Sequence, residues 1–310
     1  MWERTPMDWL IEPLRYTFFL RGMVVGMLMG LTCGVLGCFV VLRGMAFIGD
    51  ALAHAVLPGV VLAYMGGISM VLGALGAGLF AALLISLISR TDYIREDTAI
   101  GIVFTGAFAL GIVLLSRMRG YARDLTHFLF GNILGIAPSD LLLTGLVTAS
   151  VLGAIGLWYR PLMIMTFDPT HAKAIGLRLG RWHAGLMVLL ALTIVSGIQA
   201  VGVVLVAALL VTPAATARLL TNRLPTMIGL AALFGSSSAI LGLYASYMLS
   251  IASGGVVVLA STGVFAVVFL LAPTHGIVSR RIRQWWPRFT QTPDVITNEA
   301  NSETGIDPGD

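Results

Sequence analysis

Asp50 and His54 place a carboxylate and an imidazole four residues apart inside one apolar run of the chain. Because residues i and i+4 share one face of a helix, the two side chains converge. A carboxylate and a neutral imidazole together suit a divalent Mn, Fe or Zn ion. Two other interpretations stay open, a mutual hydrogen bond that steadies the helix and a proton relay. Pro58 and Gly59 follow one turn later, so we expect a helix break that exposes carbonyl groups as further ligands.

No other carboxylate lies inside an apolar run, and no other histidine lies well inside a long one. An ionised Asp in such a segment costs about 2.5–3.5 kcal/mol if the segment crosses a bilayer. We therefore expect Asp50 to have a compensating partner. His54 and a bound cation are the two candidates.

The composition excludes most classes of protein. Of the 310 residues, 57% are hydrophobic and 11% are charged, whereas a soluble domain carries about 25% charged residues. A soluble globular protein, a disordered chain and a nucleic-acid binder are therefore excluded, and the net charge of +4 indicates no nucleic-acid partner. Cys33 and Cys38 point to different helix faces, so neither a disulfide nor a thiolate metal site is expected.

The apolar runs predict an all-α integral membrane protein with about nine transmembrane helices, within a range of eight to ten. A short apolar piece at 125–136 is expected to be re-entrant or interfacial. Residues 1–17 are expected to form an interfacial segment, residues 18–288 the transmembrane domain, and residues 289–310 a disordered polar tail. The nine runs are 18–42, 47–65, 67–89, 98–116, 139–158, 183–198, 200–217, 226–249 and 254–272.

Basic residues predict the orientation, because they concentrate in cytoplasmic loops. With nine spans and the N-terminus outside, most of the 19 basic residues fall inside. If residues 18–65 form a broken, re-entrant unit, the count becomes eight and the N-terminus lies inside. Both arrangements place 160–181 and the C-terminus in the cytoplasm.

The cytoplasmic stretch 167–177 predicts a short helix. Asp168 is a candidate N-cap, Pro169 suits the first turn, and Gly176 ends the helix. Such a helix is either an ordinary connector or a projection that docks a cytoplasmic partner. His171 is expected to be solvated or interfacial and not a metal ligand.

The chain has no nucleotide site of its own. A phosphate-binding loop needs the sequence G-K-[ST], and the sole lysine, Lys173, stands between two alanines. The motifs H-E-x-x-H and G-x-S-x-G are also absent. We therefore expect a protein that is not an enzyme and that takes any ATP energy from another polypeptide.

Several separated stretches of the sequence resemble the motifs of one known family, and they occur in the same order along the chain. The run 41–59 resembles the signature of the manganese/zinc/iron permeases of the ABC importers, the membrane subunits that work with a cluster A-I metal-binding protein. The further matching stretches are 96–101, 128–134, 167–169, 199–206 and 213–218. The resemblance covers roughly residues 18–280 and leaves out the tail.

The resemblance implies the compact type II ABC importer permease fold in the bacterial plasma (inner) membrane. It implies a homodimer, two ATP-binding ATPase subunits below it, and an extracytoplasmic metal-binding protein above it. Asp50 and His54 match the family's membrane metal pair, and 167–177 matches its coupling helix. The coupling residues are then Phe167, Asp168, Pro169, His171, Lys173 and Gly176.

The transported ion is expected to be manganese, with zinc or iron as alternatives, and no permanent cofactor is expected. The lean to manganese comes from the run 124–132, which resembles the manganese branch of the family. A self-powered cation transporter or channel is the competing class, but it usually shows repeat symmetry and a site made within one chain. An intramembrane metalloenzyme would need more buried acids or histidines than one of each.

Overall fold

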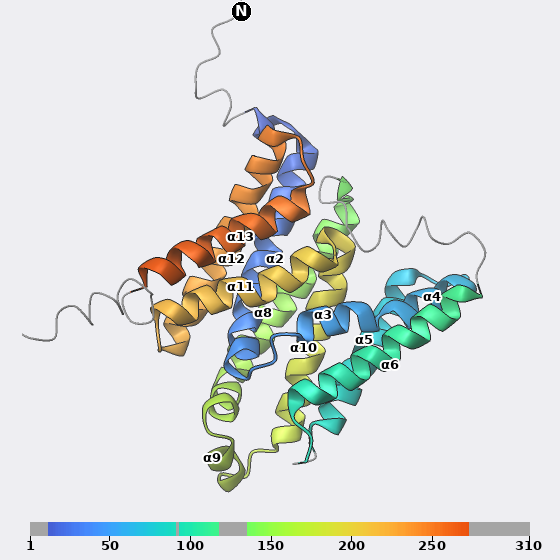
Figure 1. The fold of residues 1–310 in the computed structure, drawn as a ribbon, viewed down its shortest axis with the longest axis vertical. Coiled ribbons are helices and arrows are strands. Elements are labelled where there is room, and N and C mark those ends of the chain that lie inside the picture. Colours follow the sequence, from blue (N-terminus) through green and yellow to red (C-terminus); the bar gives the residue numbers. More distant parts are fainter. Residues whose placement is uncertain (1–11, 91–92, 118–134, 273–310) are drawn as a thin grey trace, which may run out of the picture.

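The computed structural model describes residues 12–90, 93–117 and 135–272, and within these ranges it is all helical (Figure 1). Nine helices there are long and apolar enough to cross a membrane, counting 48–65 as one span, which confirms the predicted architecture. A short 3-10 turn, Pro13–Arg15, precedes them. The helices are α2 (Thr17–Leu42), α3 (Ile48–Ala55), α4 (Leu57–Met65), α5 (Met70–Ile88), α6 (Glu96–Ser116), α8 (Pro138–Phe167), α9 (Pro169–Ala174), α10 (Leu179–Val201), α11 (Val203–Leu220), α12 (Leu224–Leu249) and α13 (Ser253–Leu271).

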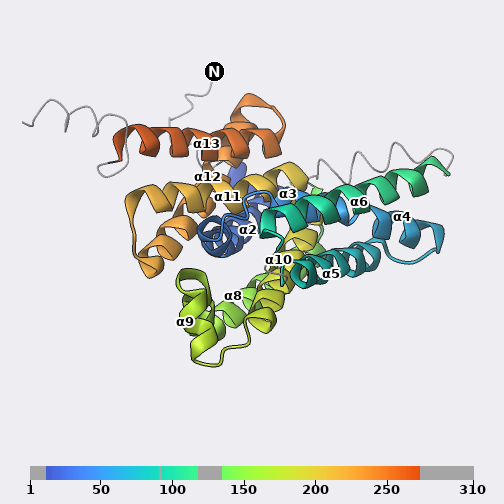
Figure 2. The ribbon, with the colours of Figure 1, turned by 60° about the horizontal axis from the view of Figure 1, so that its bottom comes forward.

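The helices form two groups on either side of a central region. On one side α2, α11, α12 and α13 pack together, and on the other α4, α5 and α6 do. Helices α3 and α10 contact members of both groups, and α9 projects at one end of the molecule (Figures 1 and 2). The candidate metal pair on α3 therefore lies where the two groups meet.

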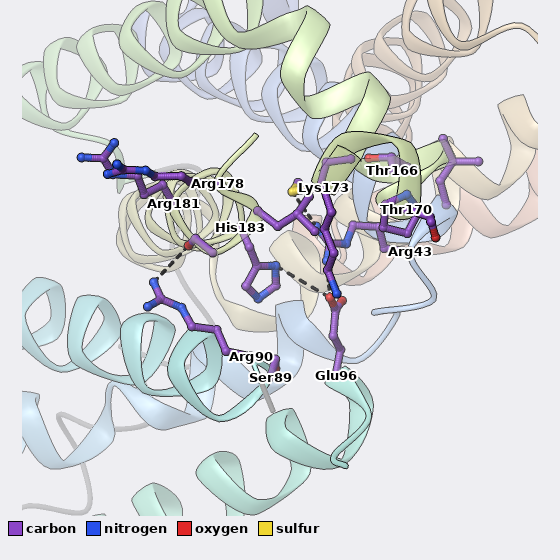
Figure 3. Close-up of a pocket in the computed structure, with 15 residues that line it drawn as sticks. Arg43, Ser89, Arg90, Glu96, Thr166, Thr170, Lys173, Arg178, Arg181 and His183 are labelled. Carbon is purple, nitrogen blue, oxygen red and sulfur yellow. Dashed lines mark hydrogen bonds and ion pairs between the residues drawn. The ribbon is translucent and has the colours of Figure 1, made fainter. Parts of the chain in front are cut away.

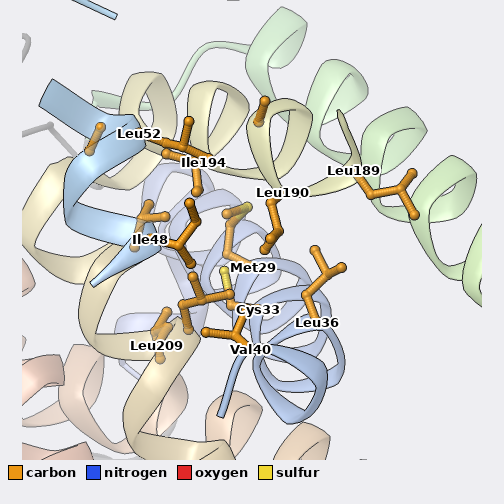
Figure 4. Close-up of a cluster of buried hydrophobic side chains, with 14 of the residues drawn as sticks. Met29, Cys33, Leu36, Val40, Ile48, Leu52, Leu189, Leu190, Ile194 and Leu209 are labelled. Atoms are coloured by element: carbon orange, nitrogen blue, oxygen red, sulfur yellow. The ribbon is translucent and has the colours of Figure 1, made fainter. Parts of the chain in front are cut away.

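The buried core lies where α2, α3, α10 and α11 meet (Figure 4). Cys33 is fully buried there beside Leu36, Ile48 and Leu190. Both cysteines are free, so the expectation of no disulfide holds. The buried face of α3 is part of this core, which fixes the direction of its polar face.

Glycines allow backbones to approach closely at two helix crossings. Gly30 on α2 meets Gly235 on α12, and Gly59 on α4 meets Gly73 on α5. A side chain at any of these positions would collide with the backbone of the partner helix. Because lipid tails are as apolar as leucine, membrane helices associate largely through such close packing.

The span 48–65 is broken just before Pro58, as the sequence predicts. The break between α3 and α4 falls at Val56, and Pro58 lies in the first turn of α4. Proline is tolerated in the first turn because the N–H it lacks has no helical partner there. Gly59 packs against α5 and breaks nothing. The carbonyl of His54 accepts a hydrogen bond from the Val56 N–H, so it is not left bare as a ligand.

Helix α8 is longer than its apolar run, because it continues past Pro161 to Phe167. Arg160, expected in a cytoplasmic loop, therefore lies within a helix. Three predictions fall largely outside the described residues, namely the interfacial segment 1–17, the short piece 125–136 and the tail 289–310.

Candidate functional site

Helix α3 brings Asp50 and His54 together as their spacing predicts. The Asp50 Oδ1 atom lies 3.4 Å from the His54 Nε2 atom. This separation is longer than the usual 2.7–3.2 Å of a strong hydrogen bond. The two groups are thus neighbours on one helix face without being locked to each other, which leaves lone pairs on both for another ligand.

The pair is not enclosed by this chain. The Asp50 side chain is 53% exposed and the His54 side chain is 29% exposed, while Ile48 and Leu52 on the same helix are fully buried. The sequence places both polar residues deep within an apolar segment. The structure instead turns their face of α3 outward, because the opposite face packs into the core.

Two phenylalanines of α6 flank the imidazole of His54. The ring centroids of Phe104 and Phe108 lie 5.9 and 5.4 Å from that of His54. They are four residues apart, so they share one face of α6. Sequence patterns alone do not identify these two residues. Their i, i+4 spacing indicates that they share a helix face, but it does not reveal which other helix that face meets.

The described part of one chain supplies too few ligands for a closed metal site. Within residues 12–90, 93–117 and 135–272 no three His, Cys, Asp or Glu side chains cluster together. Transition metals with nitrogen and oxygen ligands usually take four or more. One carboxylate and one imidazole on an open face can therefore form only part of a site.

The short helix α9 has the caps that its sequence predicts. The Asp168 carboxylate accepts a hydrogen bond from the His171 N–H, with 2.8 Å between oxygen and nitrogen. Pro169 is the first residue, and Gly176 follows the helix with a φ of +78°, a conformation that glycine adopts without strain. The helix thus has defined ends although it has only six residues.

Most of α9 faces outward. Ala172 is buried against the rest of the chain, whereas Phe167, Asp168, Pro169, His171 and Lys173 are exposed. His171 is exposed as predicted, and within the described residues it belongs to no group of three or more His, Cys, Asp or Glu side chains. The exposed side of α9 is available to another surface.

A cavity of about 1010 Å³ lies between α9 and the ends of α5, α6 and α10 (Figure 3). Among the described residues, its lining is strongly basic and includes one carboxylate, that of Glu96. The basic residues that line it are Arg43, Arg90, Lys173, Arg178 and Arg181.

Three side chains meet within this cavity. Glu96 forms an ion pair with Arg43, and its Oε1 atom also lies 3.8 Å from the His183 Nδ1 atom. The sequence places His183 at the flank of a segment, but the structure buries it to 6% exposure. It lies on the inward side of the first turns of α10, a position that spacing alone does not reveal. Both its ring nitrogens lack a hydrogen-bond partner in the described part of the chain.

The model of the ABC 3 transport family matches residues 15–272. The manganese transport system membrane protein MntC of Halalkalibacterium halodurans is 50% identical over 86% of this chain and 91% of its own length. A probable iron transport system membrane protein of Haemophilus influenzae is 38% identical, over 84% and 96% respectively. The solved structure of PsaBC from Streptococcus pneumoniae in complex with Fab includes a chain with a TM-score of 0.77 and 38% identity, covering 91% of this chain and 100% of that one. These matches confirm the resemblance and the fold that the sequence predicts.

Proposed function

This chain belongs to the ABC 3 transport family, and on that premise we propose that it is the permease subunit of an ATP-driven importer of divalent transition metal ions. It is a multi-pass protein of the bacterial membrane. Manganese is the proposed main cargo, because the name of the 50% identical relative specifies manganese transport. Iron is the alternative that a relative's name supports, and zinc remains a further candidate on ligand chemistry alone.

The observation that carries the proposal is the half-exposed pair on α3. Asp50 and His54 offer one oxygen and one nitrogen ligand on a face that this chain leaves open. A second copy of the chain, related by a two-fold axis, would supply the same two ligands from the other side. Carbonyl groups or water could complete the site in place of the second copy's ligands.

A site of this kind suits transport better than storage. The two ligands lie 3.4 Å apart on one helix and are not locked together, so this chain holds an ion through only two side chains, and the remaining ligands can move away from it. Protons compete with the metal for the imidazole nitrogen. The phenyl rings of Phe104 and Phe108 lie against the His54 imidazole on the side of α6 and hinder water from approaching it there. An ion can therefore be held briefly and then released.

Energy for the transport cycle would come from two ATPase subunits that dock at 167–177. The support for this role is structural, since α9 is capped at both ends and exposes most of its side chains. A metal-binding protein would deliver the ion on the extracytoplasmic side. This arrangement puts α9 and the basic cavity beside it in the cytoplasm, in agreement with the excess of basic residues there.

The test is metal uptake into liposomes that contain the chain reconstituted with its ATPase and metal-binding protein. We expect ATP-dependent uptake of radioactive Mn²⁺ by the wild type and its loss in Asp50→Asn and His54→Ala. Asp50→Asn keeps the shape of the side chain and removes its charge. Both variants should still assemble with the ATPase, which size-exclusion chromatography can verify.

Asp97→Asn is the matched control, because Asp97 is an exposed carboxylate at the start of α6 with no ion pair in the described residues. It should transport like the wild type. Wild-type rates in both Asp50→Asn and His54→Ala would show that the pair is structural. Uptake by the chain without its ATPase would favour a self-powered transporter. Parallel assays with Fe²⁺ and Zn²⁺ would identify the preferred ion.

A further inference from the structure

The Arg43–Glu96 ion pair connects the end of α2, which leads into α3, with the start of α6. Arg43 lies at the C-terminal end of α2, five residues before α3 begins, and Glu96 is the first residue of α6. Helices α3 and α6 pack against each other, and α6 carries the two phenyl rings beside His54. A change in this ion pair would therefore act on the segment that leads into α3 and on α6, the helix that packs against α3.

The same ion pair contacts both segments that flank α9. Arg43 Nη1 lies 3.5 Å from the sulfur of Met165, in the last turn of α8 just before the Asp168 cap. On the other side of α9, the loop 175–178 leads into α10, whose first turns present His183 to Glu96. Figure 3 shows His183 and Arg43 pointing at the same carboxylate from different helices.

Among the described residues, Glu96 has two possible partners but is bonded to only one. Its Oε1 atom pairs with Arg43, while its Oε2 atom is buried and has no hydrogen-bond partner there. His183 stands 3.8 Å away, and neither of its ring nitrogens has a partner in the same part of the chain. A buried polar group without a partner costs about 1–3 kcal/mol, so an arrangement that brings these groups together would be stabilised. Coupling between sites needs such an element with two discrete arrangements.

We propose that Glu96 is a positioning residue that exchanges its bond with Arg43 for one with His183, and that this exchange transmits movement of α9 to the metal pair on α3. In the first arrangement, the one observed here, Arg43 holds α6 to the end of α2. In the second, α10 has moved toward α6 and the His183 N–H donates to the carboxylate, which frees Arg43 and the segment leading into α3. The inference rests on the proposed function, because it assumes that α9 receives the force of the ATPase.

The experiment uses the full complex of the chain with its ATPase and metal-binding protein. It compares ATP hydrolysis with and without the Mn²⁺-loaded binding protein. In Glu96→Gln, which keeps the size of the side chain and removes its charge, we expect stimulation to fall about five-fold or more. His183→Phe keeps the Arg43–Glu96 ion pair and replaces the imidazole with a somewhat larger flat ring, yet it removes the second partner, so it should lose stimulation to a similar extent. Binding of Mn²⁺ at Asp50 and His54 should persist in both variants.

Two further variants separate this role from a structural one. The double variant Arg43→Glu with Glu96→Arg keeps an ion pair between α2 and α6, as in the first arrangement, but offers His183 no carboxylate on α6 for the second. It should therefore give as much assembled complex as the wild type but show no metal-dependent stimulation of ATP hydrolysis. Asp97→Asn, one residue from Glu96 on the exposed side of α6, should behave as wild type. Normal stimulation in Glu96→Gln or in His183→Phe, with a stimulated wild type, would overturn the exchange and leave the proposed function intact. A wild type without any stimulation would overturn both.

Discussion

Replacing Gly73 with alanine should weaken the packing of α4 on α5. The Cβ atom of an alanine there would collide with the backbone of Gly59 and lie 2.5 Å from the Cβ atom of Ala63. Real Cβ contacts are almost never shorter than 3.0 Å, and backbone atoms cannot rotate away as a side chain can. Overpacking of this kind typically costs about 1–3 kcal/mol.

Gly76→Ala is a matched control on the same helix. An added Cβ atom at Gly76 meets nothing within 4 Å. Alanine is favoured over glycine inside a helix by about 1 kcal/mol, and this gain applies equally at both positions. The difference between the two variants therefore isolates the cost of the collision, and we expect Gly73→Ala to be less stable than Gly76→Ala by about 1–3 kcal/mol.

The measurement is the free energy of unfolding in mixed detergent micelles, titrated with sodium dodecyl sulfate and followed by the fluorescence of the native tryptophans. Equal stability of the two variants would refute the reasoning, because it would mean that α4 and α5 can separate at no cost. Since α4 directly follows α3, Gly73→Ala should also lower Mn²⁺ uptake at a given amount of assembled complex, whereas Gly76→Ala should not.

Two other expectations concern α9. Asp168→Ala removes the cap on the His171 N–H, which costs about 1 kcal/mol of helix stability. Gly176→Val forces a β-branched residue to a φ of +78°. Both variants should lower metal-stimulated ATP hydrolysis while the chain stays folded, and unchanged stimulation would mean that α9 is a plain connector. A cysteine at Lys173, which is exposed, should react with a membrane-impermeant maleimide only from the cytoplasmic side in oriented vesicles, and labelling from outside would reverse the orientation.

Local sequence features predict much of this molecule because each depends on nearby residues. The nine spans follow from runs of apolar residues, and the convergence of Asp50 with His54 follows from helical spacing. The caps of α9 follow from Asp168 and Gly176. In each case the determining residues lie within one or two helical turns of one another.

The features that the sequence does not reveal depend on contacts between distant segments. Phe104 meets His54 only because α6 crosses α3, and these residues are fifty positions apart. His183 is buried where the first turns of α10 approach Glu96 at the start of α6, although the charged residues Arg178 and Arg181 shortly precede it in the sequence. The exposure of Asp50 likewise depends on which face of α3 the core takes. Apolar periodicity within one helix cannot specify which other helix it meets.

The outward-facing carboxylate of Asp50 has a consequence for the life of the unassembled chain. Its side chain is 53% exposed in a single copy, and if that face met lipid, the insertion cost would be about 2.5–3.5 kcal/mol. Under the proposed function, a second copy would cover this face, and a chain without that copy would be poorly inserted and open to membrane quality control. Surplus copies would be removed by proteolysis, and the number of permease subunits in the membrane would follow the number that have assembled.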